Sequence, residues 1–193
     1  MTRNTYMHMS LGARARRILG LASFAALALG AAACAGGEGA ADATSAQSGL
    51  IGSPAPTFTA EFVTGAGPKT LDEAKGKVVI LDFWATFCEP CKKSFPKYQA
   101  LADQYKGDVV VLGVSVDEAD GAKKEDLVKF ANDTGVKFAI VWDKDHKVAD
   151  RYKPPKMPSS FIIDKAGVVR HLHAGYEAGE EDKIKAEIDE LLK

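Results

Sequence analysis

The chain has 193 residues, of which 46% are hydrophobic and 26% charged, and these values are ordinary for one soluble globular domain. Residues 1–34 hold four of the 25 basic residues and no acidic one, so the rest of the chain has an excess of five acidic residues. A mildly acidic domain argues against nucleic acid as a partner.

The first 34 residues have the pattern of a targeting segment. Three arginines at positions 14–17 precede an apolar stretch at 18–33, which is shorter than the roughly 20 residues of a membrane span. The stretch ends in Ala-Ala-Ala followed by Cys34, and small residues before a cysteine resemble a bacterial lipobox, in which the cysteine carries a lipid. Ordinary secretory cleavage after Ala33 and an uncleaved anchor are the alternatives.

The number of cysteines favours the lipoprotein interpretation. The chain has three, and an odd number leaves one thiol unpaired in an exported protein. If Cys34 carries lipid, Cys88 and Cys91 remain as a pair outside the cytosol, where disulfides persist. Residues 35–52 are rich in Ala, Gly and Ser and are expected to be a flexible tether that precedes one domain at 53–193.

Strand and helix signals alternate along the domain. Strands are expected at 57–63, 77–85, 108–116, 138–142, 159–163 and 168–172, and helices at 90–105, 123–134, 146–152 and from about residue 179. The run at 77–85 is apolar throughout, which is typical of a strand buried on both faces. This order predicts an α/β fold with a mixed central sheet flanked by helices on both faces and a hairpin near the end.

The most informative segment is Cys88-Glu89-Pro90-Cys91, which joins a predicted strand to a predicted helix. At the start of a helix, the sulfur of Cys88 meets unpaired backbone N–H groups and the positive end of the helix dipole, and both lower its pKa. Cys91 lies one turn further on, at a spacing that allows a disulfide, and Pro90 suits the first turn. The pair predicts thiol–disulfide exchange with no bound cofactor or metal. A structural disulfide and part of a zinc site are the alternatives.

Two segments resemble a known family. Residues 81–92, LDFWATFCEPCK, resemble the active-site segment of thioredoxins, and CEPCKKSFP from Cys88 is similar to membrane-tethered TlpA/ResA-type thioredoxin-like reductases. Residues 157–164, MPSSFIID, resemble the segment that carries the family's cis-proline. The resemblance covers 53–193 and implies a thioredoxin fold with an extra N-terminal strand and an insertion near 117–135.

The resemblance also assigns roles to the second segment. It implies that Pro158 is cis and lies against the cysteine pair, where it holds Met157 so that its backbone pairs with an extended substrate. A flexible methionine suits a site that accepts varied partners. The alternative is a proline that only begins a strand.

Asp82 interrupts an otherwise apolar strand, where a carboxylate is costly unless it is paired or neutral. Thioredoxins carry an acid at this position that handles the proton of the buried cysteine, whereas TlpA/ResA-type proteins use Asn here and a Glu in the position of Ser94. We therefore expect Asp82 to be the catalytic acid of this chain, and Gly113 to stand where thioredoxin has a lysine partner. A solvated Asp82 at the sheet edge is the alternative.

The remaining residues of the loop are expected to tune the site. Trp84 should pack beside the disulfide, with an ordinary core aromatic as the alternative. Phe87 replaces a common tryptophan, so part of the partner-contact surface should differ. Glu89 opposes the helix dipole and favours a reductant, whereas Lys92 and Lys93 act in the opposite direction.

The sequence thus predicts a lipid-anchored, monomeric thiol:disulfide oxidoreductase that faces the periplasm and reduces protein disulfides in the bacterial cell envelope. By the resemblance, a membrane thiol electron donor would re-reduce it, and apocytochrome c or another envelope protein would be the substrate. The alternatives are a thioredoxin-fold peroxidase, whose threonine would stand where Ala85 is, and a copper-binding or delivery module, whose thiols would be spaced CxxxC. His171 and His173 share a strand face and are expected to be solvated rather than a metal pair.

Overall fold

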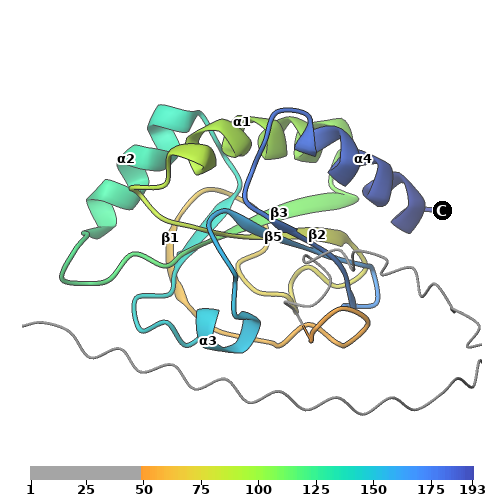
Figure 1. Ribbon diagram of the computed structural model, residues 1–193, viewed down its shortest axis with the longest axis horizontal. Helices are drawn as coiled ribbons and strands as arrows, with labels where there is room; N and C mark the ends of the chain where they lie inside the picture. Colours follow the sequence, from red (N-terminus) through yellow and green to blue (C-terminus); the bar gives the residue numbers. More distant parts are fainter. Residues whose placement is uncertain (1–48) are drawn as a thin grey trace, which may run out of the picture. The chain divides into compact units, whose positions relative to one another are not determined.

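Six strands form one mixed sheet in residues 49–193, which are the residues that the structure, a computed structural model, describes (Figure 1). The sheet has the order β1-β4-β3-β2-β5-β6. The strands are β1 (Glu61–Thr64), β2 (Val78–Trp84), β3 (Val109–Ser115), β4 (Ala139–Trp142), β5 (Ser159–Ile163) and β6 (Val169–Ala174). The helices are α1 (Glu89–Gln104), α2 (Lys124–Thr134), α3 (Ala149–Tyr152) and α4 (Glu180–Leu191).

The three central strands β2, β3 and β4 are parallel, and α1 and α2 connect them. β5 runs antiparallel to β2, β6 antiparallel to β5, and the extra N-terminal strand β1 antiparallel to β4. All seven residues of β2 are buried, as the apolar run predicts. Residues 117–135, expected as an insertion, form the loop and helix α2 that lead from β3 to β4. Gly135 ends α2 in the left-handed conformation.

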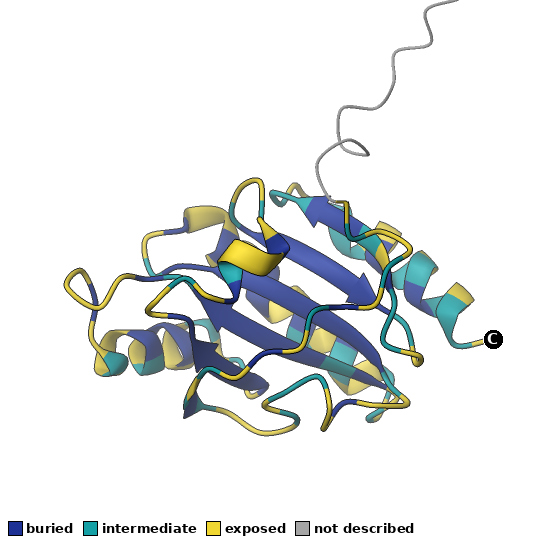
Figure 2. Cartoon of the chain, turned by 90° about the horizontal axis from the view of Figure 1, so that it is seen from below, coloured by how far each residue is buried: buried dark blue, intermediate teal, exposed yellow. Residues whose placement is uncertain are grey.

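Helices cover both faces of the sheet, but unequally. The three longer helices α1, α2 and α4 lie on one face, where Phe95, Leu127 and Ile184 belong to one apolar cluster (Figure 1). The opposite face carries a second cluster, which includes Phe58 and Tyr152, under the short α3 and stretches of coil (Figure 2). The sheet therefore separates two cores, and only the first of them includes the cysteine pair.

Two elements begin several residues later than predicted, because side chains of neighbouring segments bind the backbone. The strand expected at 57–63 begins at Glu61, since the carbonyl of Thr57 accepts a hydrogen bond from Arg151 rather than from a strand. The helix expected from residue 146 begins at Ala149, because the Asp143 carboxylate binds the backbone N–H groups that start it.

The leader, the lipidation site Cys34 and most of the predicted tether lie outside the described residues. The last tether residues that are described form a turn. The N–H of Gly52 in this turn donates to the carbonyl of Val169, the first residue of β6, at 2.8 Å. Within residues 49–193, no helix is both long enough and apolar enough to cross a membrane.

The expectation that both histidines of β6 are solvated is wrong for His173. Only 8% of its surface is exposed, and its two ring nitrogens lie 2.6 Å from Glu180 and 2.7 Å from Glu187, both on α4. His171 is partly exposed, and its Nδ1 lies 3.4 Å from Glu187. Burial by itself lowers the pKa of His173, but the hydrogen bonds and charges of Glu187 and Glu180 outweigh burial and raise it.

The contacts of His173 with Glu180 and Glu187 predict that the stability of the fold depends on pH. Because the pKa of His173 is higher in the folded than in the unfolded chain, its stabilising effect is complete below about pH 6.5 and is lost as the pH rises through the folded pKa. Replacement His173→Gln should lower the free energy of unfolding by about 1–3 kcal/mol at pH 6, and by less at alkaline pH. Urea unfolding of wild type and variant across this range measures the effect. The matched control is His171→Gln, which should change stability little, and an equal loss for His173→Gln at every pH would contradict the prediction.

Candidate active site

The cysteine pair lies at the start of α1, directly after the short connection from β2. Cys88 is the N-cap residue of α1, with its backbone in the extended region, and its sulfur accepts a hydrogen bond from the N–H of Cys91 at 3.2 Å. Pro90 lies in the first helical turn, as predicted. The two cysteines form a disulfide with their Cα atoms 5.3 Å apart. The cap position favours a thiolate at Cys88 when the disulfide is reduced.

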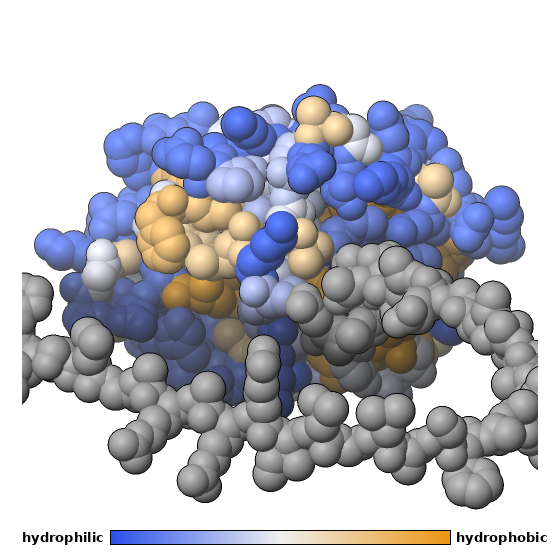
Figure 3. Space-filling model, viewed as in Figure 1, coloured by the Kyte–Doolittle hydropathy of each residue, from blue (hydrophilic) through white to orange (hydrophobic). Residues whose placement is uncertain are grey.

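The two sulfurs differ in their access to a partner. Cys88 is 6% exposed, whereas Cys91 is fully buried, so an incoming disulfide can reach only the first of them. Phe87, the residue before it, is 72% exposed, which is unusual for a large apolar side chain. Figure 3 shows an apolar patch on this face, beside the start of α1. The surface around Cys88 therefore suits contact with another protein.

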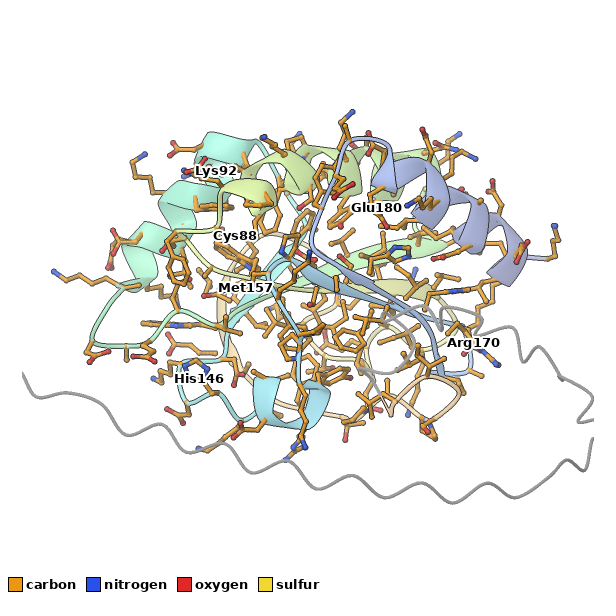
Figure 4. The ribbon with its side chains drawn as sticks, viewed as in Figure 1. Cys88, Lys92, His146, Met157, Arg170 and Glu180 are labelled. Atoms are coloured by element: carbon orange, nitrogen blue, oxygen red, sulfur yellow. A yellow bond between two sulfur atoms is a disulfide. The ribbon has the colours of Figure 1, made fainter. Side chains whose placement is uncertain are left out.

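The cis-proline expected from the resemblance is present. The Met157–Pro158 bond is cis, and the carbonyl of Pro158 accepts a hydrogen bond from the N–H of Gly175 at 2.7 Å. Met157 packs against the apolar cluster that contains both cysteines, and Figure 4 shows it close to Cys88. Pro90, Met157 and residues of the β6–α4 connection line a cleft of about 420 Å³. The second sequence segment thus lies beside the first.

Asp82 is fully buried in the middle of β2, so the alternative of a solvated carboxylate is wrong. Its Oδ1 accepts a hydrogen bond from Ser160 at 2.6 Å, whereas its buried Oδ2 has no hydrogen-bond partner among the residues described. Burial raises its pKa to about 8, although the hydrogen bond from Ser160 lowers it in part. A carboxyl group with this pKa can take up or release a proton near neutral pH.

Gly113 lies directly opposite Asp82 on β3, as predicted, so no lysine stands there. A side chain at this position would meet Trp84 Nε1, Phe138 and Ile140, all 3.2–3.4 Å from the place of its Cβ. The aromatic packing over β3 thus excludes a lysine partner for the acid, which is consistent with the high pKa of Asp82.

The other residues of the loop have clear positions. Trp84 is fully buried in the cluster that contains both cysteines, with its ring 5.0 Å from Phe95. Ser94 is buried and donates to the carbonyl of Cys91 at 3.2 Å, so it offers no acid to the site. Glu89 forms an exposed ion pair with Lys92, so the lysine offsets part of the charge that the glutamate brings to the thiolate.

Comparisons with known proteins agree with this geometry. The sequence profile of the AhpC/TSA family matches residues 51–172. The chain belongs to the AhpC/TSA family. It is 33% identical to the thioredoxin-like protein YneN of Bacillus subtilis over 138 residues, which are 72% of this chain and 79% of that protein.

Two proteins named thiol-disulfide oxidoreductase ResA are similar as well. That of Bacillus subtilis is 39% identical over 61% of this chain and 64% of its own length, and that of Geobacillus thermodenitrificans is 35% identical over 69% and 74%. A crystal structure described as a putative thiol:disulfide interchange protein DsbE from Chlorobium tepidum matches with a TM-score of 0.65 and 32% identity, over 74% of this chain and 98% of that one. The protein is therefore a ResA-like thiol-disulfide oxidoreductase with a thioredoxin fold.

One buried residue that holds the active-site loop, Asp117, could not be identified from the sequence motifs of this AhpC/TSA-family protein. The Asp117 carboxylate accepts hydrogen bonds from the backbone N–H and the hydroxyl of Thr86, and from the hydroxyl of Ser115 at 2.8 Å. Thr86 lies two residues before Cys88, so this carboxylate fixes the approach to the cysteine. The position of Asp117 in the sequence could have revealed this role. It follows the carboxyl end of β3, which lies at the same edge of the sheet as the carboxyl end of the parallel strand β2.

Within residues 49–193, no group of three or more His, Cys, Asp and Glu side chains is arranged to hold a metal ion.

The buried acid predicts how stability depends on pH. The pKa of Asp82 is about 8 in the folded protein and 3.8 without burial, so the folded state keeps a proton that the unfolded state loses. Stability should therefore fall between about pH 4 and pH 8, by up to about 6 kcal/mol. Replacement Asp82→Asn should remove most of this fall, as measured by urea unfolding of the oxidised protein. The exposed Asp103→Asn is the control and should follow the wild type, and a variant Asp82→Asn that keeps the full slope would contradict the assignment.

Proposed function

We propose that the protein acts as a monomer in the bacterial cell envelope and reduces disulfide bonds of other proteins. The observation that carries this proposal is the difference between the two sulfurs, one reachable at a helix start and the other buried directly behind it. A pair of this kind attacks with the outer thiolate and resolves with the inner thiol.

The reaction has two exchange steps. The Cys88 thiolate attacks a sulfur of the substrate disulfide, so that a mixed disulfide forms and the first substrate thiolate leaves. Cys91 then loses its proton and attacks the sulfur of Cys88, which breaks the mixed disulfide and releases the second substrate thiolate. Two electrons have moved from the dithiol to the substrate, and the protein is left with the Cys88–Cys91 disulfide.

Asp82 is the proposed acceptor of the proton from Cys91. It lies between Ile80 and Trp84 on the face of β2 that α1 covers, the face on which Cys91 is also buried. Ser94 offers no carboxylate, so Asp82 takes the role that its pKa near neutrality suits.

Substrate binding is proposed to involve the two segments that flank Cys88. Phe87 offers an exposed aromatic surface, and the backbone at Met157 would pair with an extended stretch of the substrate. Both contacts depend little on substrate sequence, which suits a protein substrate that must present a disulfide in an unfolded or flexible segment. Apocytochrome c is one candidate of this class.

The proposed location follows from the leader and the cysteines. With Cys88 and Cys91 in a disulfide, Cys34 is the cysteine left to carry a lipid, and the tether at 35–52 would let the domain reach partners near the membrane. A membrane thiol electron donor would return the disulfide to the dithiol after each cycle.

Trapping tests the order of attack. Cys91→Ala removes the resolving thiol, so mixed disulfides between Cys88 and its substrates should accumulate in cells and be seen as reductant-sensitive bands on non-reducing gels. Cys88→Ala is the matched control and should trap nothing. Equal trapping by both variants would contradict the roles assigned to the two cysteines. Identification of apocytochrome c alone among trapped proteins would support a dedicated reductase, and a broad set a general one.

The rate of disulfide reduction tests the proposed role of Asp82. If Asp82 accepts the proton of Cys91, Asp82→Asn should slow the reduction of a model protein disulfide at pH 7 by about a hundredfold, which is typical for the loss of an acid–base group. Ser94→Ala should reduce at the wild-type rate. An unchanged rate in Asp82→Asn would exclude this role, and rapid consumption of peroxide without disulfide reduction would favour a peroxidase instead.

A further inference from the structure

A row of polar side chains crosses the sheet at the level of Asp82. The strand register pairs Asp82 with Ser160 on β5, and Ser160 in turn with His173 on β6. On the other side, Asp82 pairs with Gly113. Residues that are directly paired point to the same face of a sheet, here the face that α1 and α4 cover. The acid therefore belongs to a polar row inside an otherwise apolar interior.

Hydrogen bonds in this row have one direction. The Ser160 hydroxyl donates to Asp82 Oδ1 at 2.6 Å, and the Tyr98 hydroxyl lies 2.8 Å from the same Ser160 oxygen. A serine has a single hydroxyl proton, and when Asp82 is ionised Ser160 donates that proton to the carboxylate, so Tyr98 must then donate to Ser160. All three residues are fully buried. The hydrogen bonds therefore lead from Tyr98 through Ser160 to one oxygen of Asp82.

We propose that Ser160 and Tyr98 are positioning residues for Asp82, which hold one of its carboxyl oxygens and leave the other as the single site of proton exchange. This inference rests on the proposed function of Asp82 as the proton acceptor. The oxygen that remains is Oδ2, which is buried and has no hydrogen-bond partner in the described part of the chain. With Oδ1 engaged, a proton that reaches the acid binds to Oδ2.

The position of Tyr98 links the acid to the resolving thiol. Tyr98 follows Cys91 by seven residues, which is two turns of α1, and both belong to the buried face of the helix. One rigid element thus carries the thiol that loses the proton and the hydroxyl that anchors the chain to the acceptor. Any shift of α1 would move both groups together.

Tyr98 stays a donor throughout the working pH range. Burial raises the pKa of Tyr98 well above the usual value, and the charge of Asp82 raises it further. The hydrogen bond with Ser160 lowers this pKa in part, and Tyr176 and Glu180 make smaller contributions that raise it. Tyr176 packs edge-on against the Tyr98 ring, with the ring centres 6.4 Å apart. The phenol therefore does not ionise when Asp82 does.

The charged and titratable groups around Asp82 come from few elements. α1 contributes Cys91 and Tyr98, β5 contributes the neutral Ser160, and Gly113 on β3 brings no charge. Beyond Ser160, the next charges are His173 on β6 and the two glutamates of α4 that bind it. The hydrogen bond from Ser160 is thus the one direct polar contact of the Asp82 side chain within residues 49–193.

Direct titration of Asp82 tests the proposal. In the full-length oxidised protein, carbon-13 NMR of the Asp82 carboxyl follows its ionisation while the cysteines are held in the disulfide. A hydrogen bond to a carboxylate favours the ionised form, so Ser160→Ala should raise the midpoint above about 8 by about one to two pH units. Tyr98→Phe should raise it by less, because the hydrogen bond of Ser160 remains but loses its polarising donor.

Two matched controls lie on the opposite face of the sheet. Ser159 is the buried neighbour of Ser160 and donates to the carbonyl of Lys156, and Tyr152 is a buried tyrosine that donates to the carbonyl of Pro56. Ser159→Ala and Tyr152→Phe should leave the Asp82 midpoint unchanged. If Ser160→Ala does not fold, Tyr98→Phe carries the test alone. Unchanged midpoints in the folded variants of the chain would overturn the proposal.

The pH profile of disulfide reduction separates this inference from the proposed function. If the NMR midpoint and the rise of the reduction rate with pH both shift to higher pH in Ser160→Ala, both stand. If the midpoint shifts and the rate profile does not, Ser160 and Tyr98 position Asp82 as inferred, but Asp82 is not the proton acceptor in the reaction.

Discussion

One face of α1 packs on the centre of the sheet, over β3 and the end of β2, and the position of each group in the redox site depends on this contact. The N-terminus of the helix caps itself with the sulfur of Cys88, the first turn buries Cys91, and two turns later Tyr98 reaches the row that contains Asp82. The aromatic ring of Phe95, between them, packs against Trp84 at the end of the strand. Helix and strand therefore act as one rigid support on which both thiols and the acid are fixed.

The same packing explains why a costly carboxyl group is tolerated. A buried carboxyl group destabilises the fold unless it is neutral or hydrogen-bonded, and Asp82 meets both conditions below about pH 8, with a proton and with the hydroxyl of Ser160. The residues on either side of it in β2 are all buried and apolar, and they supply the burial that offsets the cost. The fold thus loses stability as the pH rises from about 4 to about 8, and in return it holds an acid that can exchange its proton near neutrality.

Much of this architecture could be predicted from the sequence because its signals are local. The apolar run at 77–85, the CxxC segment and the Met157–Pro158 segment each carry their own pattern, and the structure has the corresponding strand, helix start and cis bond. The resemblance to thioredoxins placed Gly113 beside Asp82, and the strand register has the same pair.

Features that depend on docking could not be predicted in this way. The burial of His173 requires α4 to lie across β6, since its two glutamate partners come from the helix. Tyr98 and Ser160 are 62 positions apart, and neither side chain has a local pattern that points to the other.

The exposed side chain of Phe87 also bears on how long a partner stays bound. Full burial of one phenylalanine contributes about 2–3 kcal/mol, which is below the roughly 4 kcal/mol of a millimolar complex. An encounter anchored mainly by Phe87 is thus short-lived, so the sulfur–sulfur bond itself would set the residence time of a partner, and the partner would dissociate quickly once Cys91 breaks that bond.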